Sequence, residues 1–215
     1  MTTLSTGVQF WVAEEYGPAI NFTTNSHAAN CELVVSGSGI APGDMVEVKS
    51  NKWGRLDNRV FRAAAGSDAD TVVLEGANTV DTKRFPGTNT GTVRKIIEMV
   101  QITKPKTVNT SGGDQQFTDI TALDDDEAKQ APTTRSARTT TIEVFDDPTQ
   151  AYYAVLVAAD ESKTPRAMEL RFTDGSRTVA NCYLSISRIP NIQANAALTS
   201  TITASYAAEP VRYAA

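Results

Sequence analysis

The stretch from Asp146 to Ile189 constrains the fold most, because it predicts a short helix followed by a β-hairpin. Asp146 or Asp147 can cap a helix whose first turn contains Pro148, where a missing N–H does no harm. Thr164-Pro165 ends this helix. One side of the helix carries an apolar stripe, formed by Tyr152, Val155, Leu156 and Ala159.

Two alternating runs flank the turn Thr173-Asp174-Gly175-Ser176. Met168, Leu170 and Phe172 recur with period two before the turn, and a strand returns from Val179 to Ile186. Asp-Gly between two alternating runs is a strong short-range signal for a hairpin. A single helix beside such a hairpin, in a chain otherwise rich in strands, favours a β-sandwich with one flanking α-helix.

The composition supports a mainly β protein that is not built to grip nucleic acid. Thr, Ser, Val and Ala are abundant and Leu is sparse, which favours strands over helices. The net charge is −5 and the pI is near 5.0, so the chain lacks the basic patch with which proteins hold phosphates. No apolar run reaches the roughly 18 residues of a membrane span, and no basic and apolar leader follows Met1. We therefore expect no contact with a membrane.

Alternation and turn residues predict strands throughout the chain. They lie at 7–13, 31–35, 45–49, 59–65, 71–75, 92–103, 139–145 and 198–206. Between residues 36 and 92 the strands are short and separated by polar turns, which indicates a small barrel or a two-layer β insert.

A polar stretch between Thr110 and Arg138 is long for a loop, and such loops are usually functional or disordered until something orders them. It contains the acidic run Asp124–Glu127. The run lacks the alternating D-x-D-x-D-G pattern of a calcium loop. It can also be a solvated charge run, or part of an assembly loop that pairs with Lys or Arg of a neighbouring copy.

The residues that could act in catalysis, metal binding or phosphate binding are scattered along the sequence. His27 stands alone in a polar loop, so we expect neither a metal site nor a catalytic triad. The glycine-rich stretch 36–43 lacks G-x-G-x-x-G spacing and leads into a strand, so it predicts turns rather than a phosphate site. Cys31 and Cys182 are expected to be buried free thiols. The sequence predicts no catalytic residue and no cofactor.

Taken in order, these pieces resemble the tail tube (major tail) proteins of long, non-contractile-tailed bacteriophages. The pieces are Phe10-Trp11-Val12, the leucine–acidic cluster at 123–127, a helix ending near Asp160, the Asp-Gly hairpin, and the ending Pro210-Val211-Arg212-Tyr213. The segment from Gly39 to Lys95 resembles an insert found in a subset of these proteins, through its motifs Gly43-Asp44, Trp53-x-Arg55-Leu56, Leu74-Glu75-Gly76, Arg84-Phe85-Pro86 and Gly91-Thr92-Val93-Arg94-Lys95.

The resemblance implies a non-enzymatic structural protein of the virion tail, assembled in the host cytoplasm. It implies one tail-tube domain over residues 1–215, a β-sandwich with one flanking helix, a β-rich insert at 36–92 and an inter-ring loop at 110–138. Six copies form a ring, and the rings stack into a tube through which DNA passes without specific binding. The implied partners are a tape-measure protein, a tail tip and a tail terminator.

The resemblance also assigns residues to contacts between copies. Those of the inter-ring loop are Gln115, Gln116, Phe117, Leu123, Asp124, Asp125, Asp126 and Glu127. Exposed sheet edges need protection, which a neighbouring copy in a ring provides. On this argument the long strands 92–103 and 198–206 are ring edges, with residues Val93, Lys95, Ile97, Met99, Leu198, Ile202 and Tyr206.

An alternative function is a carbohydrate- or receptor-binding β-sandwich module. Such modules use exposed tryptophans, and the candidates are Trp11 and Trp53. Trp11 lies in an alternating strand, which favours a place in the core. Trp53 lies in a turn, where either role is open.

Overall fold

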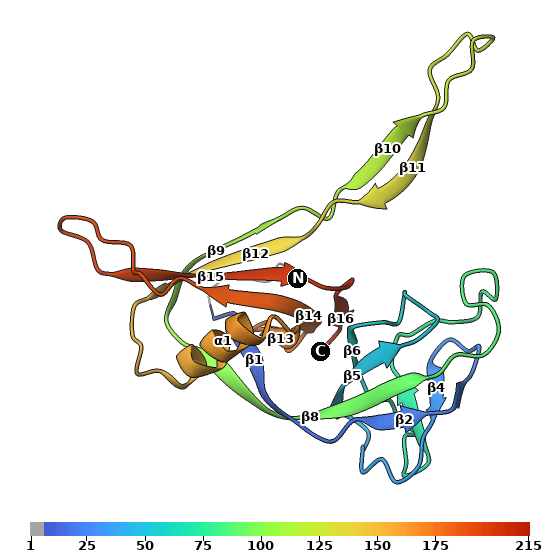
Figure 1. The fold of residues 1–215 in the computed structure, drawn as a ribbon, viewed down its shortest axis with the longest axis horizontal. Coiled ribbons are helices and arrows are strands. Elements are labelled where there is room, and N and C mark those ends of the chain that lie inside the picture. The colour runs from blue at the N-terminus through green and yellow to red at the C-terminus, as the bar shows by residue number, and fades with distance from the viewer. Residues whose placement is uncertain (1–6) are drawn as a thin grey trace.

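The structure is a computed structural model that describes residues 7–215, and these residues form a mainly β protein with a single helix, α1 (Ala151–Ser162) (Figure 1). The strands are β1 (Gln9–Tyr16), β2 (Ile20–Phe22), β3 (Thr24–Asn25), β4 (Cys31–Val34), β5 (Met45–Ser50), β6 (Arg59–Arg62), β7 (Thr71–Leu74), β8 (Gly91–Ile102), β9 (Pro105–Ser111), β10 (Gln115–Asp119), β11 (Gln130–Arg135), β12 (Thr139–Phe145), β13 (Arg166–Arg171), β14 (Arg177–Ile186), β15 (Thr199–Tyr206) and β16 (Val211–Tyr213). The mainly β fold with one short helix is confirmed.

One large antiparallel sheet organises the molecule, in the order β6-β5-β8-β1-β13-β14-β15-β12-β9, with β16 beside β14 and β2 beside β8. The sheet curls, so that its two halves face each other as layers, and β8 passes directly into β9 across the open side (Figure 1). The predicted β13–β14 hairpin is present, and its turn contains Gly175 at φ +84°. A positive φ is accessible to glycine at little cost, which explains the Asp-Gly pair.

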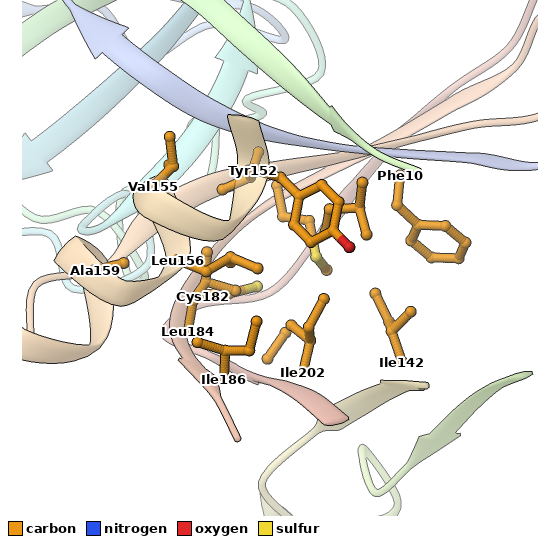
Figure 2. Close-up of a cluster of buried hydrophobic side chains, with 14 of the residues drawn as sticks. Phe10, Ile142, Tyr152, Val155, Leu156, Ala159, Cys182, Leu184, Ile186 and Ile202 are labelled. Carbon is orange, nitrogen blue, oxygen red and sulfur yellow. The ribbon is translucent and has the colours of Figure 1, made fainter. Parts of the chain in front are cut away.

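Helix α1 fills the space between the layers and supplies one side of the main core (Figure 2). The predicted stripe is confirmed, because Tyr152, Val155, Leu156 and Ala159 are all buried. They pack against Phe10, Ile142, Cys182, Leu184, Ile186 and Ile202 from four strands. Burial of such side chains stabilises a fold by about 1.5–3 kcal/mol each.

The expected helix cap is wrong. Helix α1 begins at Ala151, with Gln150 as its N-cap residue and no side-chain cap bond. Asp147 instead holds the preceding turn, since its carboxylate accepts hydrogen bonds from the backbone N–H of Thr149 (3.2 Å) and the amide of Gln150 (2.7 Å). At the other end Lys163 adopts φ +51° and its N–H donates to the carbonyl of Ala159, which closes the helix before Pro165.

A second core lies in what we call the small lobe, residues 20–93, which contains β2 to β7 and the start of β8. Its buried residues include Phe22, Cys31, Leu33, Val46, Val48, Trp53, Leu56, Phe61, Val72, Leu74, Phe85 and Val93. Strand β4 pairs with β7, so residues before position 36 contribute to the same core as the segment 36–92. The lobe is therefore wider than the segment that the sequence marks as an insert.

Buried polar contacts join the small lobe to the main sheet. Glu47 of β5 is 1% exposed and accepts a hydrogen bond from the amide of Asn181 in β14 (2.7 Å). It also forms an ion pair with Arg94, whose guanidinium lies 3.8 Å from the centroid of the Tyr16 ring. Burial raises the pKa of Tyr16 to about 12, and its hydroxyl accepts the N–H of Ala167 (2.8 Å). A network of buried hydrogen bonds and an ion pair thus attaches the lobe to β14 and β13.

The two cysteines are free and buried, as the sequence predicts. Burial raises the pKa of both the Cys31 and the Cys182 thiol, so neither is activated as a nucleophile. Within residues 7–215 no helix combines the length and the apolar character that crossing a bilayer demands.

Candidate assembly surfaces

The most prominent surface feature is a hairpin that we call the arm, residues 112–138, which projects far from the sheet (Figure 1). Strands β10 and β11 pair along it, from Gln115 with Arg135 to Asp119 with Gln130. The arm occupies most of the polar stretch that the sequence marks as a long loop. That stretch is therefore largely an ordered two-stranded ribbon, and an isolated ribbon of this kind is marginally stable in water.

Two glycines set the point where the arm leaves the sheet. Gly112 and Gly113 have φ values of +79° and +87°. A Cβ atom on Gly112 would lie 1.9 Å from the carbonyl oxygen of Ala137, and one on Gly113 would lie 2.6 Å from the guanidinium of Arg138. The strands of the arm therefore approach each other more closely here than any residue with a side chain permits.

The tip of the arm, residues 120–129, combines exposed apolar and acidic side chains. Ile120 and Leu123 of the tip are 54% and 110% exposed, and Phe117 of the adjoining strand β10 is 59% exposed. Asp125 shapes the turn, since it accepts the N–H of Ala122 (2.9 Å) and pairs with Lys129. Both contacts lower the pKa of Asp125 below its usual range, and the hydrogen bond from Lys129 has the larger effect.

The other three carboxylates of the acidic run are available to a partner. Asp124, Asp126 and Glu127 are exposed and form no hydrogen bond or ion pair with any residue from 7 to 215. Among residues 7–215 there is no group of three or more His, Cys, Asp or Glu residues that could hold a metal ion.

The sheet has an open edge at β9. This strand pairs with β12 on one side only, and all seven of its residues are exposed. Glu143 of β12 ties it to the sheet, because its carboxylate accepts hydrogen bonds from Thr107 (2.9 Å), Lys106 (3.1 Å) and Thr199 of β15 (2.7 Å).

One of the two expected ring edges, the strand at 198–206, is not at an edge of the sheet. Strand β15 lies between β14 and β12, so Ile202 and Tyr206 belong to an interior strand, and Leu198 precedes it. The expectation of an edge at 198–206 is wrong for the single chain, because β14 and β12 pair with β15 on its two sides, and the edge of the sheet is β9.

Strand β8 is paired on both sides only in its first part. Val93 and Lys95 face β5, and Lys95 also forms an ion pair with Asp44 (2.6 Å). From Ile97 to Ile102 the described chain places a strand, β1, along only one side of β8. Ile97, which is 55% exposed, and Met99 lie in this part, so it retains a free backbone edge.

A further exposed apolar segment, at 187–198, has no counterpart in the sequence predictions. It joins β14 to β15 and projects on the side of the molecule opposite to the arm (Figure 1). Ile189 and Ile192 are 78% and 76% exposed, and Leu198 is 46% exposed. Three large apolar side chains exposed in one segment are typical of a contact surface. Isolated apolar residues in a polar loop gave no signal in the sequence.

A comparison with protein-family models identifies the kind of protein that carries these surfaces. The family model "Phage tail tube protein, TTP" matches residues 51–215, from within the small lobe to the end of the chain. The chain belongs to the phage tail tube protein family. It is therefore a structural subunit of the virion tail, without enzymatic activity, that assembles into the tail tube. A search of curated proteins gave no match to this tail tube protein.

The tryptophans of this tail tube protein do not form a sugar platform. Trp53 is 2% exposed, donates from its indole N–H to the carbonyl of Pro86 (3.0 Å) and lies against the Phe85 ring. Trp11 is half-buried, and the guanidinium of Arg171 lies 4.2 Å from its ring centroid. Trp11 thus lies outside the main core, contrary to expectation, but its ring is covered.

Proposed function

We propose that six copies of this tail tube protein close into a ring, and that the rings stack into the tube of a long, non-contractile tail. The arm is the observation that supports this proposal most directly. It is a long ribbon whose residues are mostly exposed, and Leu123, Asp124, Asp126 and Glu127 of its tip have no polar or ionic partner among residues 7–215. Such a segment gains stability when it lies against another copy.

Within a ring, neighbouring copies join through the two open edges of the sheet. The exposed strand β9 of one copy is placed to pair with the free edge of β8, between Ile97 and Ile102, of the next. These edges are different surfaces, so the contact is heterologous, and such contacts form closed rings when the rotation closes. Backbone pairing would also remove the aggregation hazard of an open edge.

Between rings, we assign the contact to the arm, which occupies most of the predicted inter-ring loop 110–138. The residues concerned are those of its strands and tip, namely Gln115, Gln116, Phe117, Leu123, Asp124, Asp126 and Glu127, with Asp125 shaping the turn. The segment 36–92 within the small lobe would then thicken the wall and contact neighbouring subunits.

The tube would be the conduit for DNA, built on a tape-measure protein from a tail tip and closed by a terminator. A net charge of −5 suits a conduit, because carboxylates repel phosphates and an acidic wall does not retain DNA.

Electron microscopy of the purified protein at high concentration tests the assembly. We expect rings or tubes with a central hole. Reversing the free charges of the tip, as Asp124→Lys, Asp126→Lys and Glu127→Lys, should block tube growth while circular dichroism stays unchanged. The matched control keeps the charge, as Asp124→Glu, Asp126→Glu and Glu127→Asp, and should form tubes. Normal tubes from the reversed variant would refute the role of the acidic run, and a persistent monomer of the unaltered protein would refute the assembly.

A further inference from the structure

We propose that the arm tip of one copy docks in an arginine-lined trough at the base of the arm of another copy. This inference rests on the proposed role of the arm between rings and names the surface that receives it. The trough consists of two adjoining cavities of about 200 and 440 Å3, which share Ala208 and Glu209. They lie on the two sides of the segment 207–210, between the arm and the small lobe.

The first cavity has an apolar lining and a basic rim. Tyr206, Ala208 and Pro210 line it together with Arg135 and Arg138. The Arg138 guanidinium lies 5.9 Å from the centroid of the Tyr206 ring. The Arg135 side chain is exposed and forms no hydrogen bond or ion pair with the described residues. The cavity is large enough to take an aliphatic side chain that enters between positive charges.

The second cavity continues the positive surface onto the small lobe. Arg55, Arg59 and Arg84 line it. Arg59 is packed over the ring of Phe61 (4.8 Å), and its Nε is buried without a partner among residues 7–215. Arg55 offers its carbonyl to Arg59 (3.2 Å), but its own guanidinium has no bonded partner within the described chain.

The trough has an excess of positive charge. Two carboxylates, Asp57 and Glu209, accompany its five arginines, of which Arg84 also forms an ion pair with Asp81 (3.2 Å). Asp57 is occupied by the N–H of Ser50 (2.9 Å) and the amide of Asn58 (3.0 Å). In an acidic protein, this excess marks the trough as a place for a negatively charged partner.

The arm tip has the complementary pattern. Leu123 is the most exposed large apolar residue of the described chain, and three unpaired carboxylates, Asp124, Asp126 and Glu127, follow it in sequence. An apolar residue next to acidic side chains complements an apolar cavity that is also lined by arginines. Guanidinium groups pair well with carboxylates, because their planar donors fit the two oxygens.

The docked tip must come from a second copy. About ten residues separate Gly113 from Leu123, and extended chain of that length spans roughly 33 Å. The β10–β11 pairing extends the arm outward, so its tip lies away from its own base (Figure 1). Tip and trough are different surfaces, so the contact is heterologous and can repeat from ring to ring without limit.

Disulfide trapping tests the contact, and the burial of Cys31 and Cys182 keeps the background low. Leu123→Cys and Ala208→Cys are introduced together, the protein is assembled and mildly oxidised, and the products are separated without reductant. We expect a ladder of linked chains. The control pairs Leu123→Cys with Ile192→Cys, which lies on the exposed segment 187–198, and should show no more than the background of the single variants.

A mixture of the two single variants gives a result that does not depend on tubes. Leu123→Cys and Ala208→Cys proteins, mixed in equal amounts at high concentration, should yield far more heterodimer than the roughly twofold excess over either homodimer that random pairing gives. Its absence, or a link from position 123 to position 192 instead of 208, would overturn the trough as receptor. If the heterodimer forms while the unaltered protein never gives rings or tubes, the docking contact stands and the proposed function fails.

Reciprocal charge reversal provides a second measurement. Arg55→Glu with Arg135→Glu should raise the protein concentration needed for tube formation about tenfold or more, because repulsion replaces attraction at each contact. Combining these changes with lysines at 124, 126 and 127 in the same chain should restore assembly. A combined variant that assembles no better than either parent would contradict the pairing.

Discussion

Asn181 of β14 donates a 2.7 Å hydrogen bond from its side-chain amide to the carboxylate of Glu47 in β5, and both residues are buried. The two residues are 134 positions apart, and their strands are not neighbours in the large sheet, because β8, β1 and β13 lie between β5 and β14 in the strand order. Glu47, which also pairs with Arg94 of β8, therefore connects the part of the sheet that belongs to the small lobe with β14.

Replacing Glu47 by alanine should lower the free energy of unfolding by about 3 kcal/mol or more. The change leaves the buried Asn181 amide and the partly exposed Arg94 guanidinium without their acceptor. Urea denaturation monitored by circular dichroism measures the effect. Glu98→Ala, at an exposed position of β8, is the control and should change stability by less than about 0.5 kcal/mol. An equal loss from both variants would contradict the network.

Tyr213→Phe should weaken the attachment of the C-terminal strand to the lobe. The Tyr213 hydroxyl accepts the N–H of Arg62 (2.8 Å) and donates to the carbonyl of Glu75 (3.2 Å), and the residue is 4% exposed. Loss of the hydroxyl leaves a buried N–H unpaired, which costs about 1–3 kcal/mol. Hydrogen exchange should show faster exchange at Arg62 than in the unaltered protein. Unchanged exchange at that amide would show that another group accepts it.

The ion pair between Arg62 and Glu75 predicts a dependence of stability on pH. Two hydrogen bonds, of 2.5 and 2.6 Å, join the groups, and the contact with Arg62 lowers the pKa of Glu75 from its usual 4.5. A lowered pKa stabilises the folded state above pH 4.5, and this contribution is lost as the pH falls through the folded pKa. The unfolding free energy of Glu75→Gln should therefore fall less than that of the unaltered protein between pH 5 and pH 3. Parallel curves would exclude the contribution.

Gly112→Ala should disturb the arm and leave the core intact. The new Cβ would meet the Ala137 carbonyl at 1.9 Å, and the φ of +79° adds strain. We expect faster proteolysis within 112–138 and poorer tube formation. Gly37→Ala is the matched control, because its φ is also positive, at +65°, while its Cβ would meet nothing within 4 Å. Similar behaviour of the two variants would assign the effect to backbone strain alone.

Neither native thiol should react with a thiol reagent in the folded protein. Cys31 and Cys182 are 0% exposed, and burial raises the pKa of both. Both should react in denaturant, which a colorimetric thiol assay shows. Rapid labelling of the native protein would reveal an opening of one of the two cores, and a cysteine-free background would then be needed for trapping experiments.

The sequence predicts well those elements whose side chains alternate between a core and solvent. The stripe from Tyr152 to Ala159 and the alternation around Gly175 are local patterns, so α1 and the β13–β14 hairpin can be found without a structure. Strands β9, β10 and β11 are different. Almost every residue in them is exposed, so they carry no alternation and are defined by backbone pairing alone. The same absence concealed the true sheet edge at β9.

The assembly surfaces show the same limit. The acidic run is visible in the sequence because its members are adjacent. The trough is not visible, since the fold brings Arg55 and Arg84 of the small lobe near Arg135 of the arm. Likewise, the lobe core combines Cys31 with Leu74 through the pairing of β4 with β7, and no local pattern indicates that partner.

An arm that leaves the sheet on one side only gives each molecule a direction. Copies that engage arm to base in sequence all point the same way, and the resulting column has two unlike ends. If the arm tip docks in the trough as proposed, one end of the column presents carboxylates and a leucine on free arms, and the other presents arginines in empty troughs. A factor that starts such a column and a factor that stops it would then carry opposite charge at their contact surfaces, and neither could substitute for the other.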